Sequence, residues 1–154
     1  MTSLIVVNLH GPINTRAEVR TTLIELGIGK RFAATVVVDD PSTVGALHLC
    51  KDYIAWSEVD AQMLESLLKT RGRVSNSKTL DEESLKLMGY KDHSDLASKM
   101  IKGASILSSV PGLKPYFGLS PPRGGFKRSS RRQFREGGIL GENPTLPDLV
   151  RRMM

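Results

Sequence analysis

The first 72 residues alternate between continuous apolar runs and apolar residues at helical spacing. Runs rich in β-branched or aromatic residues are typical of buried strands, and they stand at 4–9, 34–38 and 52–57. Between and after these runs the apolar spacing predicts helices at 14–26, 42–49 and 59–70. The resulting β-α-β-α-β-α order predicts an α/β domain in which helices pack on a small three-stranded sheet.

Residues that favour helix starts precede each of these helical segments. Asn14 or Thr15 can cap the first helix, and Ser42 opens the second. Ser57 followed by Asp60 resembles a capping arrangement for the third. The three helices therefore have local start signals that agree with their apolar spacing.

The apolar pattern becomes less regular after a polar link at 73–78. The stretch TLDE at 79–82 matches a capping box and predicts a helix, and a second helix is predicted from residue 94. A short strand and a closing helix are expected further on, at 116–119 and near 147–154. Because these segments are too interrupted for a large core of their own, we expect an appendage docked on the first half. The predicted units are an α/β core at 1–73, a helical extension at 74–112, and a basic extended arm with a short terminal helix at 113–154.

The positive charge is concentrated near the end of the chain. The whole protein carries 22 Lys and Arg against 16 Asp and Glu, a net charge of +6. Residues 1–75 and 76–112 are each neutral, whereas 113–154 hold nine basic and three acidic residues, which accounts for the entire imbalance. Charge segregated in this way indicates a polyanionic partner.

The cation-rich stretch of the basic arm, residues 113–135, has the composition of an extended segment that reaches nucleic acid. Pro121 and Pro122 disfavour helix, and Gly124 and Gly125 allow close approach of the backbone to a partner. Phe126 and Phe134 stand between the charges and can stack on bases. We expect no contribution from 120–141 to a hydrophobic core. Arginine suits bidentate phosphate contacts, and the cations of the arm are Lys114, Arg123, Lys127, Arg128, Arg131, Arg132 and Arg135. A solvated basic loop without a fixed partner is the alternative.

The sequence does not favour catalysis, a metal, a cofactor or a membrane. His10, His48 and His93 are scattered without ligand spacing, and Cys50 stands alone. The acidic pair before Pro41 reads as a turn, and the glycines at 137–141 are not followed by the residues of a phosphate loop. No apolar run approaches the roughly 20 residues that span a bilayer, and the start has no signal-peptide pattern. We expect a soluble, cytosolic protein.

Several short stretches together resemble a known ribosomal family. They are LHGPIN at 9–14, LGI at 26–28, TVVVD at 35–39, DYIAW at 52–56, KTRG at 69–72, LSPPRGG at 119–125 and EGGILG at 136–141. The last two are the most specific of them. With these stretches the chain is similar to the universal L-thirty family of large-subunit ribosomal proteins in its longer archaeal form, which is related to the eukaryotic L-seven protein.

The resemblance implies a ferredoxin-like core bound to large-subunit ribosomal RNA, with an extension that lies along the RNA. It places RNA near the first turn and before the second strand, at His10, Gly11, Asn14, Arg16, Arg20, Lys30 and Arg31, and along the arm, where Gly124 and Gly125 join the cations. Two departures from the family pattern stand out. His10 occupies a position where many relatives have arginine, and Val44 precedes Gly45 where bacterial members carry arginine, so no RNA contact is claimed for that helix start.

The sequence therefore predicts a structural constituent of the large ribosomal subunit that is not an enzyme. Its expected partners are large-subunit ribosomal RNA and neighbouring ribosomal proteins, with no membrane and no small-molecule substrate. The arm is expected to order when it meets RNA. Two alternatives remain at this point, namely a ferredoxin-like regulatory module that binds a small molecule, and a free RNA chaperone.

Overall fold

A single mixed sheet of six strands forms the centre of the molecule. The computed structural model describes residues 2–103 and 107–154. The strands are β1 (Ser3–Asn8), β2 (Ala33–Val38), β3 (Ile54–Glu58), β4 (Phe117–Gly118), β5 (Ser129–Gln133) and β6 (Gly138–Glu142), in the order β4-β2-β1-β3-β6-β5. The pairs β4–β2, β2–β1 and β1–β3 are antiparallel, and β6 is parallel to both β3 and β5.

The predicted α/β class is confirmed, and the sheet has six strands where the sequence predicts three in the first half of the chain. The short strand predicted at 116–119 is present as β4. The three predicted strands are the central ones, β2-β1-β3, and later segments extend the sheet at both edges. An unpaired strand edge leaves backbone N–H and C=O groups without hydrogen-bond partners. Strand β4 supplies these partners to β2, and β6 supplies them to β3. The pattern missed β5 and β6 because β5 reads SSRRQ and β6 contains two glycines.

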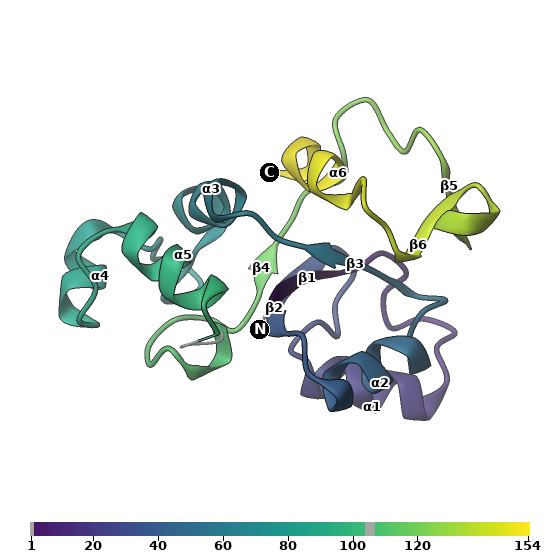
Figure 1. The fold of residues 1–154 in the computed structure, drawn as a ribbon, viewed down its shortest axis with the longest axis horizontal. Coiled ribbons are helices and arrows are strands. Elements are labelled where there is room, and N and C mark those ends of the chain that lie inside the picture. The colour runs from purple at the N-terminus through teal and green to yellow at the C-terminus, as the bar shows by residue number, and fades with distance from the viewer. Residues whose placement is uncertain (1, 104–106) are drawn as a thin grey trace.

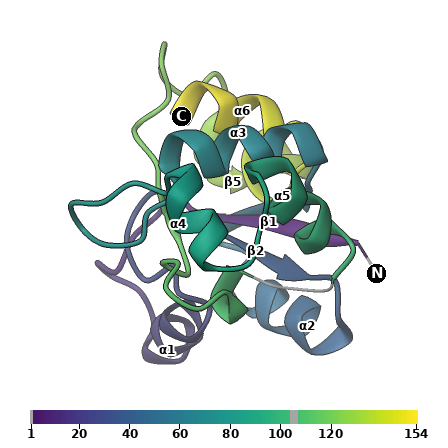
Figure 2. The same ribbon diagram turned by 90° about the vertical axis from the view of Figure 1, so that its left-hand side faces the viewer.

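Helices cover both faces of this sheet, as Figure 1 shows. Helices α1 (Ala17–Glu25) and α2 (Pro41–Leu49) lie on one face, and α3 (Ala61–Arg71) and α6 (Leu146–Met153) lie on the other. Helices α4 (Glu82–Leu87) and α5 (His93–Ile101) pack beside α3 at one end, as the side view in Figure 2 shows. Two 3₁₀ turns, η1 (Leu107–Ser109) and η2 (Phe134–Glu136), complete the described elements.

Strand β1 is buried along its whole length because both of its faces are covered. Leu4 and Val6 belong to the core under α1 and α2, whereas Ile5 and Val7 belong to the core under α3, α5 and α6. Successive strand residues point to opposite faces, so a strand that is buried on both sides becomes a continuous apolar run. This explains why β1 is so readily recognised in the sequence.

The second half of the chain contributes to the same core as the first. Leu85, Leu96, Leu140 and Val150 belong to one cluster with Ile5 of β1. The expectation that 120–141 would add nothing to a core is wrong, because Ile139 and Leu140 of β6 are buried there. The division into units at 1–73, 74–112 and 113–154 stays a prediction, and residues 104–106 of the second unit lie outside the described residues.

Three predicted helix caps are replaced by other contacts. Ser57 Oγ donates to the carbonyl oxygen of Glu58 at 2.9 Å, and α3 begins without a side-chain cap. Thr15 Oγ1 donates to the carbonyl oxygen of Gly11 at 2.9 Å, and α1 begins two residues later without a side-chain cap. Thr79 Oγ1 donates to Asp81 Oδ1 at 3.1 Å, so the predicted capping box is wrong. The two threonine hydroxyls act inside the loops that precede their helices, a competing use that short polar side chains commonly have.

Candidate nucleic-acid interface

A buried asparagine connects the two loops at one end of the central strands. The side-chain oxygen of Asn8 accepts hydrogen bonds from the amides of His10, at 3.2 Å, and Gly11, at 3.0 Å. Its amide nitrogen donates to the carbonyl of Ile28 at 2.7 Å, and its own backbone carbonyl accepts from the amide of Phe32 at 2.7 Å. Asn8 thereby holds the turn after β1 against the loop before β2.

Close packing of Gly11 against Arg31 positions the charges of these loops. Gly11 is buried with φ +88°, and a Cβ there would lie 3.1 Å from Arg31 Cβ. The Arg31 guanidinium lies 4.7 Å from the ring centroid of Phe32, a cation–π arrangement that leaves the N–H edge of the guanidinium accessible. His10 packs edge-on against Tyr53, with ring centroids 4.9 Å apart.

The first part of the basic arm is fastened to α6. The amide of Arg123 donates to the carbonyl of Arg152 at 3.0 Å. The Arg152 guanidinium donates in return to the carbonyls of Arg123, at 3.3 Å, and Gly125, at 2.9 Å. Phe126 then lies 6.3 Å from Phe32, between ring centroids. The arm therefore passes from α6 to the loop that carries Arg31.

The second part of the arm is folded against the far edge of the sheet. The Arg128 guanidinium lies 4.5 Å from the ring centroid of Phe134. Gln133 Nε2 donates to Asp52 Oδ1 at 3.0 Å, which connects the arm to the loop before β3. A Cβ at Gly138 would overlap the backbone carbonyl of Arg132, so only glycine fits where the chain turns from β5 into β6.

The arginines of the arm are exposed and have no acidic partner among residues 2–103 and 107–154. The three ion pairs there join Lys69 to Glu65, Lys99 to Asp95 and Arg151 to Asp148, all of them within helices. The hydrogen bond and charge of Glu65 raise the pKa of Lys69, and those of Lys99 lower the pKa of Asp95. Intramolecular carboxylates thus satisfy cations on the helices and leave those of the arm available.

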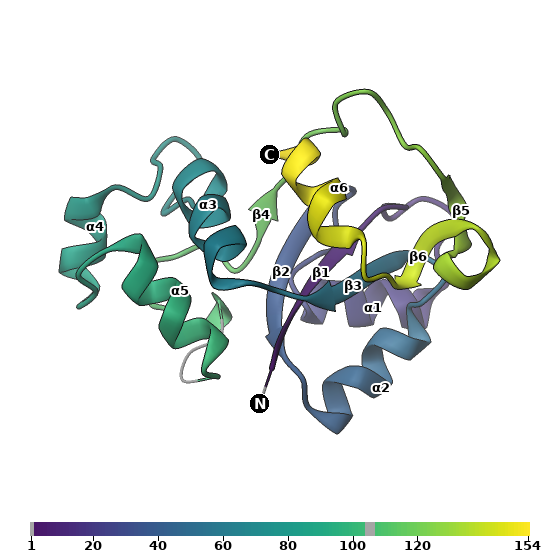
Figure 3. The same ribbon diagram turned by 45° about the horizontal axis from the view of Figure 1, so that its top comes forward.

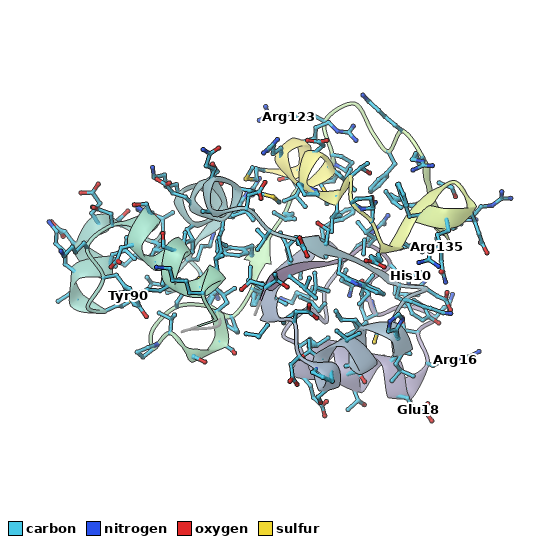
Figure 4. The ribbon with its side chains drawn as sticks, in the orientation of Figure 1. His10, Arg16, Glu18, Tyr90, Arg123 and Arg135 are labelled. Atoms are coloured by element: carbon cyan, nitrogen blue, oxygen red, sulfur yellow. The ribbon has the colours of Figure 1, made fainter. Side chains whose placement is uncertain are left out.

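Most of the predicted site residues lie on the surface. The exposed ones are His10, Asn14, Arg16, Arg20, Lys30, Arg31, Arg123, Gly124, Gly125, Lys127, Arg128, Arg131, Arg132 and Arg135. In Figure 4, His10, Arg16 and Arg135 lie at the same end of the molecule, opposite Tyr90. Gly11 is buried and shapes the turn, and Lys114 is half-buried and lies near Arg73 instead.

Relatives in other organisms identify the family. The sequence profile described as Ribosomal protein L30p/L7e matches residues 4–54. The chain is 37% identical to "Large ribosomal subunit protein uL30" of Cenarchaeum symbiosum, over 97% of both chains, and 39% identical to that of Methanoregula boonei, over 96% of this chain and 97% of the relative. It is 37% identical to the protein of the same name from Thermofilum pendens over 100% of both chains. The chain belongs to the uL30 family.

Membership in the uL30 family confirms the predicted archaeal form of a large-subunit ribosomal protein. It also confirms that the chain is not an enzyme and that it belongs to the cytoplasmic large ribosomal subunit. The relatives match nearly the full length, so the basic arm lies within the region that they share with this chain.

Other polar groups of this uL30 chain have structural roles. Asp40 accepts a hydrogen bond from the amide of Ser42 at 3.2 Å and caps α2, as a turn residue does. His48 packs edge-on against Trp56, and His93 Nε2 lies 3.1 Å from the carbonyl oxygen of Leu80. Among residues 2–103 and 107–154, no three metal-ligating side chains gather in one place. In the same ranges no helix is long and apolar enough to cross a bilayer.

Sequence reasoning missed three arginines of this uL30 chain that contact residues 114–125 of the arm. Arg152 donates to the arm backbone, and Arg71 donates to Ser120 Oγ and to the carbonyl of Met154, both at 2.7 Å. The carbonyl of Arg73 accepts from the amide of Lys114 at 2.9 Å. Arg71 and Arg73 were overlooked because they lie in a segment whose net charge is zero.

Proposed function

We propose that the chain binds large-subunit ribosomal RNA through one continuous cationic surface. This cationic surface is defined here as His10, Arg16, Arg20, Lys30, Arg31, Arg123, Lys127, Arg128, Arg131, Arg132 and Arg135. The observation that carries the proposal is the arm itself, whose five arginines are exposed and unpaired within the described residues while its backbone is fixed to α6 and to the sheet.

The phosphate backbone of RNA is the partner that suits this arrangement. A guanidinium donates two parallel hydrogen bonds to a phosphate, and each neutralised phosphate releases counterions. Stacking of Arg31 on Phe32 and of Arg128 on Phe134 restricts both side chains before binding. Preorganised donors lose less conformational entropy on binding, which raises affinity. Further ordering of the arm on RNA stays a prediction.

The α/β core acts as a rigid scaffold for this surface and adds contacts of its own. Near the first turn the permanent charges are those of Arg16 and Arg31, so contacts with phosphate there rest on these two side chains. Neighbouring ribosomal proteins are proposed as further partners. The segment 76–112, which contains α4 and α5, suits them because it has no net charge and exposes 87% of Leu87. Tyr90 of this segment lies at the end of the molecule opposite His10 and Arg135 (Figure 4).

Fractionation of a cell extract on a sucrose gradient tests this function. We expect the chain to sediment with the large ribosomal subunit at moderate salt. A variant in which Arg123, Arg131, Arg132 and Arg135 are replaced by glutamine should be released from that peak at lower salt than the natural chain. A chain found mainly at the top of the gradient would instead support the free chaperone or the small-molecule sensor.

A further inference from the structure

A second cationic hollow lies beside β4, at the edge of the sheet opposite β5. It has a volume of about 290 Å³ and is lined by Arg71, Arg73, Asn76, Lys114, Tyr116 and Gly118. Three of these side chains are positively charged and none is acidic. The view in Figure 3 shows β4 beside α3, and Arg71 is the last residue of this helix.

Backbone contacts between distant segments build this hollow. The hydrogen bond from the amide of Lys114 to the carbonyl of Arg73 joins residues 41 positions apart. Gly72 lies between the two arginines, and a Cβ there would overlap the carbonyl of Leu68 and lie 3.1 Å from the side chain of Leu80. Asn76 accepts a hydrogen bond from Lys114 Nζ through its side-chain oxygen. The cations are therefore held at one place by a tightly packed turn.

Tyr116 also lines an apolar hollow next to the cationic one. This hollow has a volume of about 400 Å³, and its wall includes Ile24, Gly27, Ala33 and Pro115. Ile24 is 63% exposed, so its side chain presents apolar surface to solvent at this hollow. Lys114 Nζ lies 5.8 Å from the Tyr116 ring centroid, so the ring stands between charged and apolar surroundings.

We propose that the two hollows around Tyr116 form a binding site for one unpaired nucleotide of RNA. The cationic hollow takes the phosphate on Arg73 and Lys114, and the base stacks on Tyr116 over the apolar hollow. Aromatic stacking combined with backbone cations is the usual mode of binding unpaired RNA. The site rests on the proposed RNA-binding function and extends it, because Arg71 joins this hollow to Ser120, which precedes the arginine-rich part of the arm.

Variants of the full chain, titrated with deproteinised large-subunit ribosomal RNA, test this site. The double variant Arg73→Gln with Lys114→Gln should reduce the slope of log K against log salt by about 0.7 to 1.4, depending on whether the two cations share a phosphate. Tyr116→Leu should weaken binding at least about fivefold and leave the slope unchanged, since stacking carries no charge. The matched control is Lys91→Gln with Lys102→Gln, which removes two exposed charges from the neutral segment and should change neither quantity.

The outcomes separate this site from the general RNA-binding function. If the natural chain binds RNA and only the arm variant changes the slope, the nucleotide site is wrong and the proposed function stands. If the natural chain shows no salt-dependent RNA binding, both fail. Cross-linking of the natural chain to RNA that contains 4-thiouridine checks the site without any variant, and we expect a cross-linked peptide that contains Tyr116. Saturable binding of uridine monophosphate without RNA would assign the site to a free nucleotide and overturn the RNA assignment.

Discussion

Replacing four arginines of the basic arm by glutamine should flatten the salt dependence of RNA binding. The variant changes Arg123, Arg131, Arg132 and Arg135, which are exposed and form no side-chain hydrogen bond or ion pair within residues 2–103 and 107–154. Arg128 is retained because it stacks on Phe134. If each of the four contacts one phosphate, the slope of log K against log salt should fall by about 2.8 to 3.6, at 0.7 to 0.9 per contact.

This change is large enough to measure with few titrations. Between about 50 and 200 mM salt, a slope difference of that size makes the natural chain lose about 50- to 150-fold more affinity than the variant. Fluorescence anisotropy with labelled ribosomal RNA at four or more salt concentrations gives both slopes. The free energy of unfolding should change by less than about 0.5 kcal/mol, because the four side chains make no packing contact that the fold requires.

A charge-matched control separates position from net charge. Replacing Lys78, Lys86, Lys91 and Lys102 by glutamine also lowers the net charge from +6 to +2, since four positive charges are lost. These lysines are exposed and lie in the neutral segment. The control should retain the natural slope. Equal slopes in the arm variant and the natural chain would refute the role of the arm, and an equal loss in both variants would show that net charge alone drives binding.

Three further predictions concern stability. Gly138→Ala should lower the free energy of unfolding by about 1 to 3 kcal/mol, because the added Cβ would overlap the carbonyl of Arg132. Gly45→Ala in α2 should raise it by about 0.4 to 1 kcal/mol, because the added Cβ would meet no atom within 4 Å. Urea denaturation measures both changes. Leu140→Ala should lower the free energy of unfolding by about 2 to 5 kcal/mol. The variant should still unfold in one transition with an unchanged m-value, because β6 shares its core with β1. A separate early transition would contradict a shared core. Burial raises the pKa of the Cys50 thiol above its ordinary 9.0, so the unfolded chain loses this proton first and the free energy of unfolding should fall as the pH rises above 9.0. In a Cys50→Ala variant this fall should be smaller, which is checked by measuring the free energy of unfolding of the natural chain and of the variant at several pH values.

Local pattern was sufficient for the first half of the fold. Strand β1 pairs with both β2 and β3, and the helices that follow these strands cover the sheet. Apolar spacing and order along the chain therefore predict these elements. The arm was recognisable for a similar reason, because its arginines are neighbours in sequence and their summed charge is visible without coordinates.

The remaining strands and the second cationic hollow depend on contacts between distant segments. Strand β5 reads SSRRQ and carries no apolar pattern, so it is a strand only because β6 offers it a partner. The sequence predicts a short strand at 116–119, but only the folded sheet shows that this strand, β4, pairs with β2. Arg73 and Lys114 come together through a backbone hydrogen bond across 41 positions, in two segments that composition treats separately. Sequence alone thus determined the central strands and the site of excess charge, since both follow from near neighbours. Tertiary structure decided which edges are paired and which distant cations meet, because those depend on the geometry of the assembled sheet.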